Sequence, residues 1–226
     1  PATRLLCVEQ THNFAGGAVW PLRELAEVCA AAHDRGLAVH MDGARLLNAV
    51  VASGVSAERF CAHVDSVWIC FTKGLGAPVG AVLAGDEEFI ARARRFKHGY
   101  GGALRQAGVA AAGCLYALDR HVPRLAEDHA HARRLADGLR QLDGVRLLTP
   151  RPDTNMVFFT LKAEGWTHAA FCDRLAARGV RIGVVGSALR AVTHLDVSVE
   201  DVDHALEVVA KVLTAPPPVD TRATNP

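Results

Sequence analysis

Residues 67–80 read VWICFTKGLGAPVG, an apolar run that leads into one lysine, Lys73, and a loop rich in glycine. Thirty-one residues before this lysine, Asp42 follows a second apolar run, within the segment HMDGAR at residues 40–45. Short apolar runs separated by helical patterns are typical of buried parallel strands. Ligands of such sheets bind at the carboxyl ends of the strands, because the crevice opens there. We therefore expect Asp42 and Lys73 to face one ligand from the ends of two neighbouring strands.

The alternation of strand and helix patterns runs through the first 143 residues. Strands are predicted at 4–8, 37–41, 65–71 and 79–84, and helices at 21–35, 44–53, 86–96, 104–118 and 123–142. This pattern predicts an α/β fold with a mostly parallel sheet. The segment 144–152, which begins with glycine and contains two prolines, then indicates a hinge.

A second, smaller α+β domain is predicted over residues 144–213. Its strands are expected at 155–161, 181–185 and 188–197, and its helices at 167–178 and 199–213. Asp201 and Asp203 favour the start of the last helix, because negative charge stabilises a helix N-terminus. The remaining residues, 214–226, are polar and rich in proline, and we expect them to form a disordered tail.

The composition is that of an ordinary globular protein, with 226 residues, 50% hydrophobic, 22% charged and a net charge of +1. This balance gives no reason to expect nucleic acid or an anionic membrane as a partner. No apolar run approaches the roughly 20 residues of a membrane span. The six cysteines are scattered without a CxxC pair, which favours reduced thiols and a cytoplasmic protein. The histidines and cysteines lack zinc-site spacing, so no metal centre is expected.

Lys73 and Asp42 together predict a site for pyridoxal phosphate (PLP). That cofactor needs a lysine for its Schiff base and an acidic partner for its pyridine nitrogen. The chain has four lysines against twenty-one arginines, and an arginine could not replace Lys73 because a guanidinium stays protonated. Taken alone, Lys73 could also be a surface residue in a turn, and Asp42 could cap the helix that follows it.

Three more side chains are expected near the same strand ends. Thr72 could bind the cofactor phosphate or make an ordinary strand-end hydrogen bond. Arg45, one helical turn after Asp42, could contact the cofactor ring or a substrate carboxylate, or form a surface ion pair. His12 could take the proton of a substrate hydroxyl or make a purely structural hydrogen bond.

Two arginines in other elements are candidates for binding anions. Arg105 opens a predicted helix after a glycine loop, where a cation beside backbone N–H groups suits a phosphate. Arg190 lies on an apolar strand of the second domain, where a lone arginine needs an anion such as a substrate carboxylate.

Seven segments, in order along the chain, resemble the L-threonine aldolase family, whose members are PLP enzymes of fold type I. They are EQTHN (9–13), HMDGAR (40–45), TKGLGAPVG (72–80), GGALRQAG (101–108), EDH (127–129), DTNM (153–156) and VTHLDVS (192–198). The resemblance implies cleavage of L-threonine or L-allo-threonine to glycine and acetaldehyde. It also implies a homotetramer that is a dimer of dimers, with active sites between subunits.

The resemblance gives each candidate residue a role by its position in a motif. Lys73 would be the Schiff-base lysine and Asp42 the partner of the ring nitrogen. The remaining roles are the phosphate region for Arg105, ring and substrate for Arg45, the substrate carboxylate for Arg190, and the substrate hydroxyl for His12.

Three departures from the family pattern accompany the resemblance. The chain begins at the strand before residues 11–13, so about the first third of a family member, with a phosphate-binding Gly-Thr turn and a ring-stacking histidine, is expected to be absent. His98 stands where the family has a lysine, and Thr72 replaces the more usual serine. Serine hydroxymethyl transfer, β-elimination and an inactive, truncated aldolase are the alternatives that the sequence leaves open.

Overall fold

The computed structural model describes residues 2–217 and consists of two compact units. The first unit ends at Ala126 and the second begins at Glu127. Helix α6 (Leu125–Arg140) lies across this division, whereas the predicted domain boundary lay after it, at residue 143. Of the predicted disordered tail, Thr214 still belongs to the last helix, and residues 218–226 lie outside the described part of the chain.

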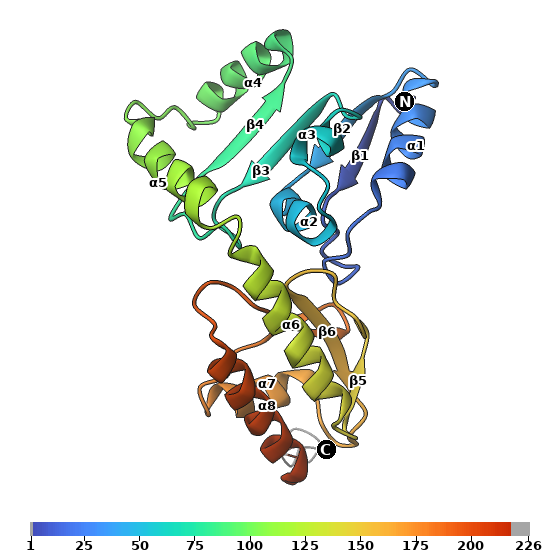
Figure 1. Cartoon of the computed structure of the whole chain (residues 1–226), viewed down its shortest axis with the longest axis vertical. Helices are drawn as coiled ribbons and strands as arrows, with labels where there is room; N and C mark the ends of the chain where they lie inside the picture. The colour runs from blue at the N-terminus through green and yellow to red at the C-terminus, as the bar shows by residue number, and fades with distance from the viewer. Residues whose placement is uncertain (1, 218–226) are drawn as a thin grey trace, which may run out of the picture. The chain divides into compact units, whose positions relative to one another are not determined.

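A four-stranded sheet organises the first unit (Figure 1). Its order is β1 (Leu5–Glu9), β2 (Ala38–Asp42), β3 (Ser66–Cys70) and β4 (Ala81–Gly85). The first three strands are parallel and β4 is antiparallel to β3, so the sheet is mostly parallel, as predicted. Each strand pairs with the next one along the chain.

Three helices pack against one face of this sheet. They are α1 (Leu22–His33), α2 (Leu46–Ser53) and α3 (Ala57–Cys61), and their side chains share a core with the strand residues Val8, Val39, Met41 and Val67. Successive strand residues point to opposite faces, so Asp42 and Trp68 lie on the other face of the sheet. Helices α4 (Glu87–Gly99) and α5 (Ala107–Arg120) follow β4, and α4 has no buried side chain.

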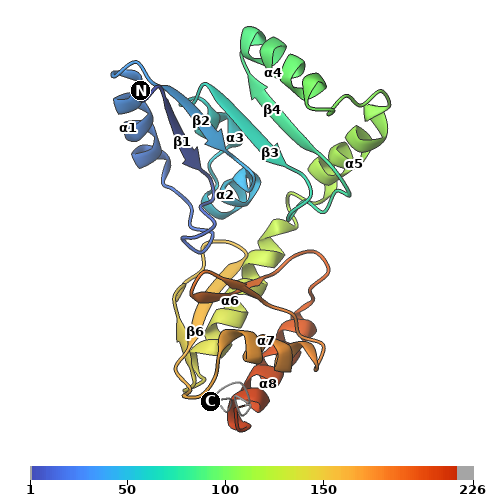
Figure 2. The same cartoon turned by 180° about the vertical axis from the view of Figure 1, so that it is seen from behind.

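The second unit contains an antiparallel sheet with helices packed on it (Figure 2). The strand order is β5 (Val145–Leu147), β6 (Met156–Leu161), β8 (Ala188–Val192) and β7 (Gly183–Val185). Helices α6, α7 (His168–Ala176) and α8 (Val199–Thr214) supply apolar side chains to its core, among them Leu139, Phe171 and Val208. Helix α8 begins with a capping box between Ser198 and Asp201, which satisfies two backbone N–H groups.

Strand β8 ends at Val192, five residues before the predicted end. The next residue, Thr193, is buried, and its N–H still donates to the carbonyl oxygen of Asn155 (3.0 Å). Its hydroxyl donates a hydrogen bond to the carbonyl oxygen of Asp128 (2.6 Å), and its own carbonyl accepts one from the side-chain amide of Asn155 (2.8 Å). Parts of three motifs, at residues 127–129, 153–156 and 192–198, therefore meet in one buried polar cluster.

Three findings concern membrane spans, metal sites and disulfides among the described residues. No helix within residues 2–217 has the length and apolar character needed to cross a bilayer. In the same range, no three His, Cys, Asp or Glu side chains are grouped so as to hold a metal ion. All six cysteines are free thiols.

Candidate cofactor site

The candidate site in the first unit is built on the sheet face that carries Asp42. Asp42 is the last residue of β2, and it is in register with Glu9 on β1 and with Trp68 on β3. Residues in register on parallel strands point to the same face. The side chains of Glu9, Asp42 and Trp68 therefore form a row across the sheet, opposite the face that α1, α2 and α3 cover.

Lys73 reaches this row from the loop that follows β3. The loop is fixed at both ends, because the N–H of Ala77 donates to the carbonyl of Phe71 (2.8 Å) and the N–H of Phe71 donates to that of Gly80 (3.0 Å). Phe71 and Leu75 are buried, which anchors the loop. The ε-amino nitrogen of Lys73 lies 5.4 Å from the centroid of the Trp68 ring. Asp42 and Lys73 thus both adjoin Trp68, and their shared role at one cofactor site stays a prediction.

Two glycines next to these residues permit close approaches of the backbone. A Cβ atom at Gly43 would lie 2.9 Å from the carbonyl oxygen of Trp68, and one at Gly74 would lie 2.9 Å from a methyl carbon of Leu125. Real Cβ atoms do not come so close, so Gly43, which faces backbone, requires glycine for steric reasons, whereas at Gly74 the end of the Leu125 side chain would have to shift. The glycines that follow Asp42 and Lys73 therefore allow β2 and the lysine loop to pack closely.

Asp42 does not cap the helix after it. Helix α2 begins at Leu46 with Arg45 at the N-cap position, and the Oδ1 atom of Asp42 instead accepts a hydrogen bond from the N–H of Ala44 (3.0 Å). The helix-cap alternative is therefore wrong. The carboxylate is partly exposed and held by one local bond, with its other oxygen available to a ligand.

His12 and Asp42 line the same cavity, of about 450 Å³, together with Cys7, Glu9 and Trp20. The Nδ1 atom of His12 accepts a hydrogen bond from the N–H of Ala15 (3.1 Å), and its Nε2 lies 3.5 Å from a carboxylate oxygen of Glu9. Since Nδ1 is an acceptor, the neutral ring carries its proton on Nε2, facing Glu9. The structure thus gives His12 a structural hydrogen bond and also places it beside Asp42.

Thr72 and Arg45 lie on either side of the same strand end. The hydroxyl of Thr72 contacts the thiol of Cys70 at 3.1 Å, which agrees with the strand-end alternative and leaves the side chain exposed. Arg45 is partly buried and lines a small cavity with Gly74. Lys73 itself is exposed, because no described element of the first unit covers this side of the strand end.

Arg105 and Arg190 belong to segments other than those that form this row. Arg105 is exposed in the turn before α5, whose N-cap is Gln106, so the helix begins three residues later than predicted. Arg190 belongs to the second unit, where it is partly buried on β8 between Phe158 of β6 and Gly183 of β7. Within its own unit, it is on the face of β8 opposite Leu189 and Ala191, which belong to the helix-covered core.

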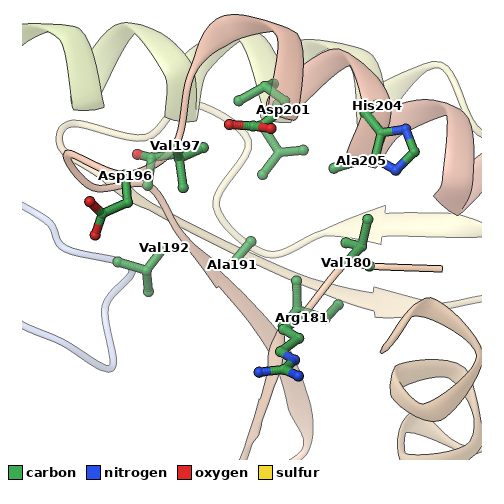
Figure 3. A pocket seen from close by; sticks show the side chains of 14 residues that line it. Val180, Arg181, Ala191, Val192, Asp196, Val197, Asp201, His204 and Ala205 are labelled. Carbon is green, nitrogen blue, oxygen red and sulfur yellow. The ribbon is translucent and has the colours of Figure 1, made fainter. Parts of the chain in front are cut away.

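A separate cavity of about 300 Å³ lies within the second unit (Figure 3). His204 and Ala205 of α8 form one wall, and Ala191 and Val192 of β8 contribute to the other (Figure 3). The charged residues that line it, Arg181, Asp196 and Asp201, do not converge on one point, and Asp201 is already engaged in the helix cap (Figure 3). The arrangement lacks the few convergent polar groups that fix a small ligand.

Comparison with known proteins identifies the family of this chain. Residues 1–164 match the family model described as beta-eliminating lyase. The chain belongs to the beta-eliminating lyase family. Among its relatives is the low specificity L-threonine aldolase of Escherichia coli (strain K12), which is 43% identical over 198 residues that cover 88% of this chain and 57% of that protein. Low-specificity L-threonine aldolase 1 of Arabidopsis thaliana is 38% identical over 208 residues, covering 91% and 58%.

Solved structures of the family share the fold. A putative L-allo-threonine aldolase of Listeria monocytogenes EGD-E matches with a TM-score of 0.77 at 24% identity, covering 91% of this chain and 60% of that one. A mutant of the lyase C-DES, solved with glycine covalently linked to its PLP cofactor, matches with a TM-score of 0.70 at 20% identity. The predicted fold class and the predicted resemblance to threonine aldolases are confirmed. The chain spans about three fifths of the length of these family members.

Trp68 is the residue of the site that the sequence did not reveal. It stands in the middle of an apolar run, where an aromatic side chain is typical of a buried strand. The available signal was its spacing, because it precedes Cys70 and Thr72 by even steps and therefore shares their face of the strand.

Proposed function

We propose that this chain belongs to a PLP-dependent L-threonine aldolase, which cleaves β-hydroxy-α-amino acids to glycine and an aldehyde. The observation that carries the proposal is the row on the sheet, where Asp42 and Lys73 adjoin one indole ring. Identity of 43% to a low specificity L-threonine aldolase supports the reaction and L-threonine and L-allo-threonine as substrates.

The residues of the row fit PLP by their chemistry. PLP, when bound, supplies an electron sink for breaking a bond at the substrate's α-carbon. Lys73 offers an exposed primary amine for covalent attachment, and Asp42 offers a carboxylate oxygen that would hold a proton on the pyridine nitrogen. The close backbone approach at Gly43 brings the end of β2 against β3 and so fixes the position of that carboxylate.

The other candidates take the roles of binding and proton transfer. Thr72 and Arg105 would contact the cofactor phosphate, and Arg45 the ring or the substrate. His12 lies in the cavity beside Asp42, where its Nε2–H could hold a water molecule that takes the proton of the β-hydroxyl group. Arg190 would bind the substrate carboxylate, since a partly buried guanidinium can form paired hydrogen bonds with that group.

We also propose that the protein is a cytoplasmic homo-oligomer, a dimer of dimers, that forms glycine in threonine catabolism. Exposed apolar side chains gather on consecutive elements of the first unit, which supports burial against other chains. They are Val82 and Leu83 on β4, Phe96 on α4, and Val109, Leu115 and Tyr116 on α5. The free thiols support a reducing compartment.

The test is an absorbance titration of the purified chain with PLP, followed by assay of glycine and aldehyde. We expect a saturable yellow band that Lys73→Ala abolishes and that Lys162→Ala, on another exposed lysine, leaves intact. Release of glycine from L-threonine and phenylserine, but not from serine, would distinguish an aldolase from hydroxymethyl transfer and β-elimination. A band that persists in Lys73→Ala would contradict the site.

A further inference from the structure

Lys73 and Trp68 form a contact that the proposed catalytic roles do not use. The ε-amino nitrogen of Lys73 lies 5.4 Å from the ring centroid of Trp68, within the range of a cation–π interaction. Within residues 2–217, the amine of Lys73 has no hydrogen bond and no ion pair, so the indole is the group that holds its charge.

The position of Trp68 explains how this contact selects one arrangement of the lysine. Trp68 is partly buried in β3, in register with Asp42 on one side and Leu83 on the other, so its ring is held by the sheet. A free lysine side chain samples many rotamers, which costs conformational entropy when the amine must occupy one place. A fixed aromatic face reduces that freedom and keeps the amine on the face of the sheet that carries Asp42.

The indole also differs from a carboxylate as a partner for this amine. A carboxylate would accept hydrogen bonds from the ammonium group, and these bonds would have to break before the nitrogen could bond to a cofactor. A ring face attracts the ammonium charge without a directional hydrogen bond. The indole therefore holds the amine near one position but lets it leave the ring face easily.

We propose that Trp68 is a positioning residue for Lys73, which keeps the ε-amino group beside Asp42 before the cofactor is attached. This inference rests on the proposed function for the identity of the attached group. The contact itself does not depend on that function, so the two can be tested separately.

The contact is tested first, without cofactor. Reductive ¹³C-methylation of the four lysines gives dimethylamino signals that keep their charge, and Lys73→Arg identifies the signal of Lys73. We expect this signal to be shifted upfield of the other three by the ring current of the indole. Trp68→Leu should move it to the position of the exposed lysines, and Trp68→Phe should leave part of the shift. An unshifted Lys73 signal in the unsubstituted chain would overturn the inference.

The consequence for attachment is tested with PLP and borohydride, which traps the lysine-linked cofactor for peptide mass spectrometry. At subsaturating PLP, Trp68→Leu should lower the trapped fraction at Lys73 by about two- to fivefold, the size expected for one exposed cation–π contact. Trp166→Phe, in the second unit, should not change it, and the fraction at Lys97 should stay constant. An unchanged fraction at Lys73 in Trp68→Leu would also overturn the inference.

The two experiments separate the inference from the function on which it rests. An upfield Lys73 signal, together with trapping no greater at Lys73 than at Lys97, would contradict the proposed cofactor site. A saturable, selective attachment at Lys73 that is insensitive to Trp68→Leu would leave the cofactor site standing and remove Trp68 from it.

Discussion

Replacing Gly43 by alanine should destabilise the first unit and disturb the end of β2. The N–H of Gly43 donates a hydrogen bond to the carbonyl oxygen of Trp68 (2.9 Å), which ties β2 to β3 next to Asp42. An added Cβ atom would lie 2.9 Å from that oxygen and 2.9 Å from a methyl carbon of Val67. The strand ends must separate to admit the methyl group, because neither neighbour is the end of a flexible side chain.

Two costs make up the expected effect of Gly43→Ala. Weakening the backbone hydrogen bond costs about 0.5–1.5 kcal/mol, and forcing an extra carbon into a packed site costs about 1–3 kcal/mol. We therefore expect the free energy of unfolding of the first unit to fall by about 1.5–4.5 kcal/mol. Glycine at this position does not have a positive φ angle, so the effect is one of space and not of backbone strain.

The measurement is urea unfolding followed by tryptophan fluorescence in a Trp166→Phe background, which leaves Trp20 and Trp68 as reporters of the first unit. Gly108→Ala is the matched control, because Gly108 lies in α5 and a Cβ atom there meets nothing within 4 Å. That control should raise the free energy of unfolding by up to about 1 kcal/mol, since alanine favours a helix. Equal unfolding midpoints for Gly43→Ala and the unsubstituted chain would refute the argument from packing.

Three further predictions concern the second unit. Burial, and secondarily the charge of Arg133, lowers the pKa of His129 to about 4. The unfolded chain binds this proton near pH 6.5, so the unit should have its full stability above pH 6.5. Its free energy of unfolding should fall by up to about 1.4 kcal/mol per pH unit as the pH falls toward 4. In His129→Phe, acid unfolding followed by Trp166 fluorescence should no longer show this dependence on pH. Thr193→Val should cost about 0.5–1.5 kcal/mol in urea unfolding, because it removes the buried 2.6 Å hydrogen bond from the hydroxyl to the carbonyl oxygen of Asp128. Ser198→Ala should cost about 0.5–2 kcal/mol by removing the cap of α8, and Ser198→Asp should restore most of it.

Most of the fold could be predicted because hydrophobic periodicity marks long elements clearly. All four strands of the first unit were expected within two residues of their observed ends. Helix α3 and strand β5 were not predicted. They have five and three residues, which is too short for a hydrophobic periodicity to be recognised. The antiparallel direction of β4 is set by the short lysine loop, which no alternation of residue types reveals.

The candidate site, like the fold, could be predicted only in part from the sequence. Asp42, Lys73 and His12 were predicted because residues at the ends of parallel strands share one crevice, and this reasoning needs only the strand boundaries. The exposure of Lys73 and its contact with Trp68 depend on which side of β3 each residue faces and on what covers that side. Those are properties of packing, so the sequence pattern alone does not contain them.

The simple strand order of the first unit has a consequence for biosynthesis. Since β1, β2, β3 and β4 pair in the order in which they leave the ribosome, each strand meets an existing partner as it emerges. Within residues 2–217, none of these four strands depends on a later segment for its first partner, except that β1 waits for β2, and contacts close in sequence form quickly. Asp42 and Lys73 can therefore stand on one sheet while the ribosome is still translating the helices that follow.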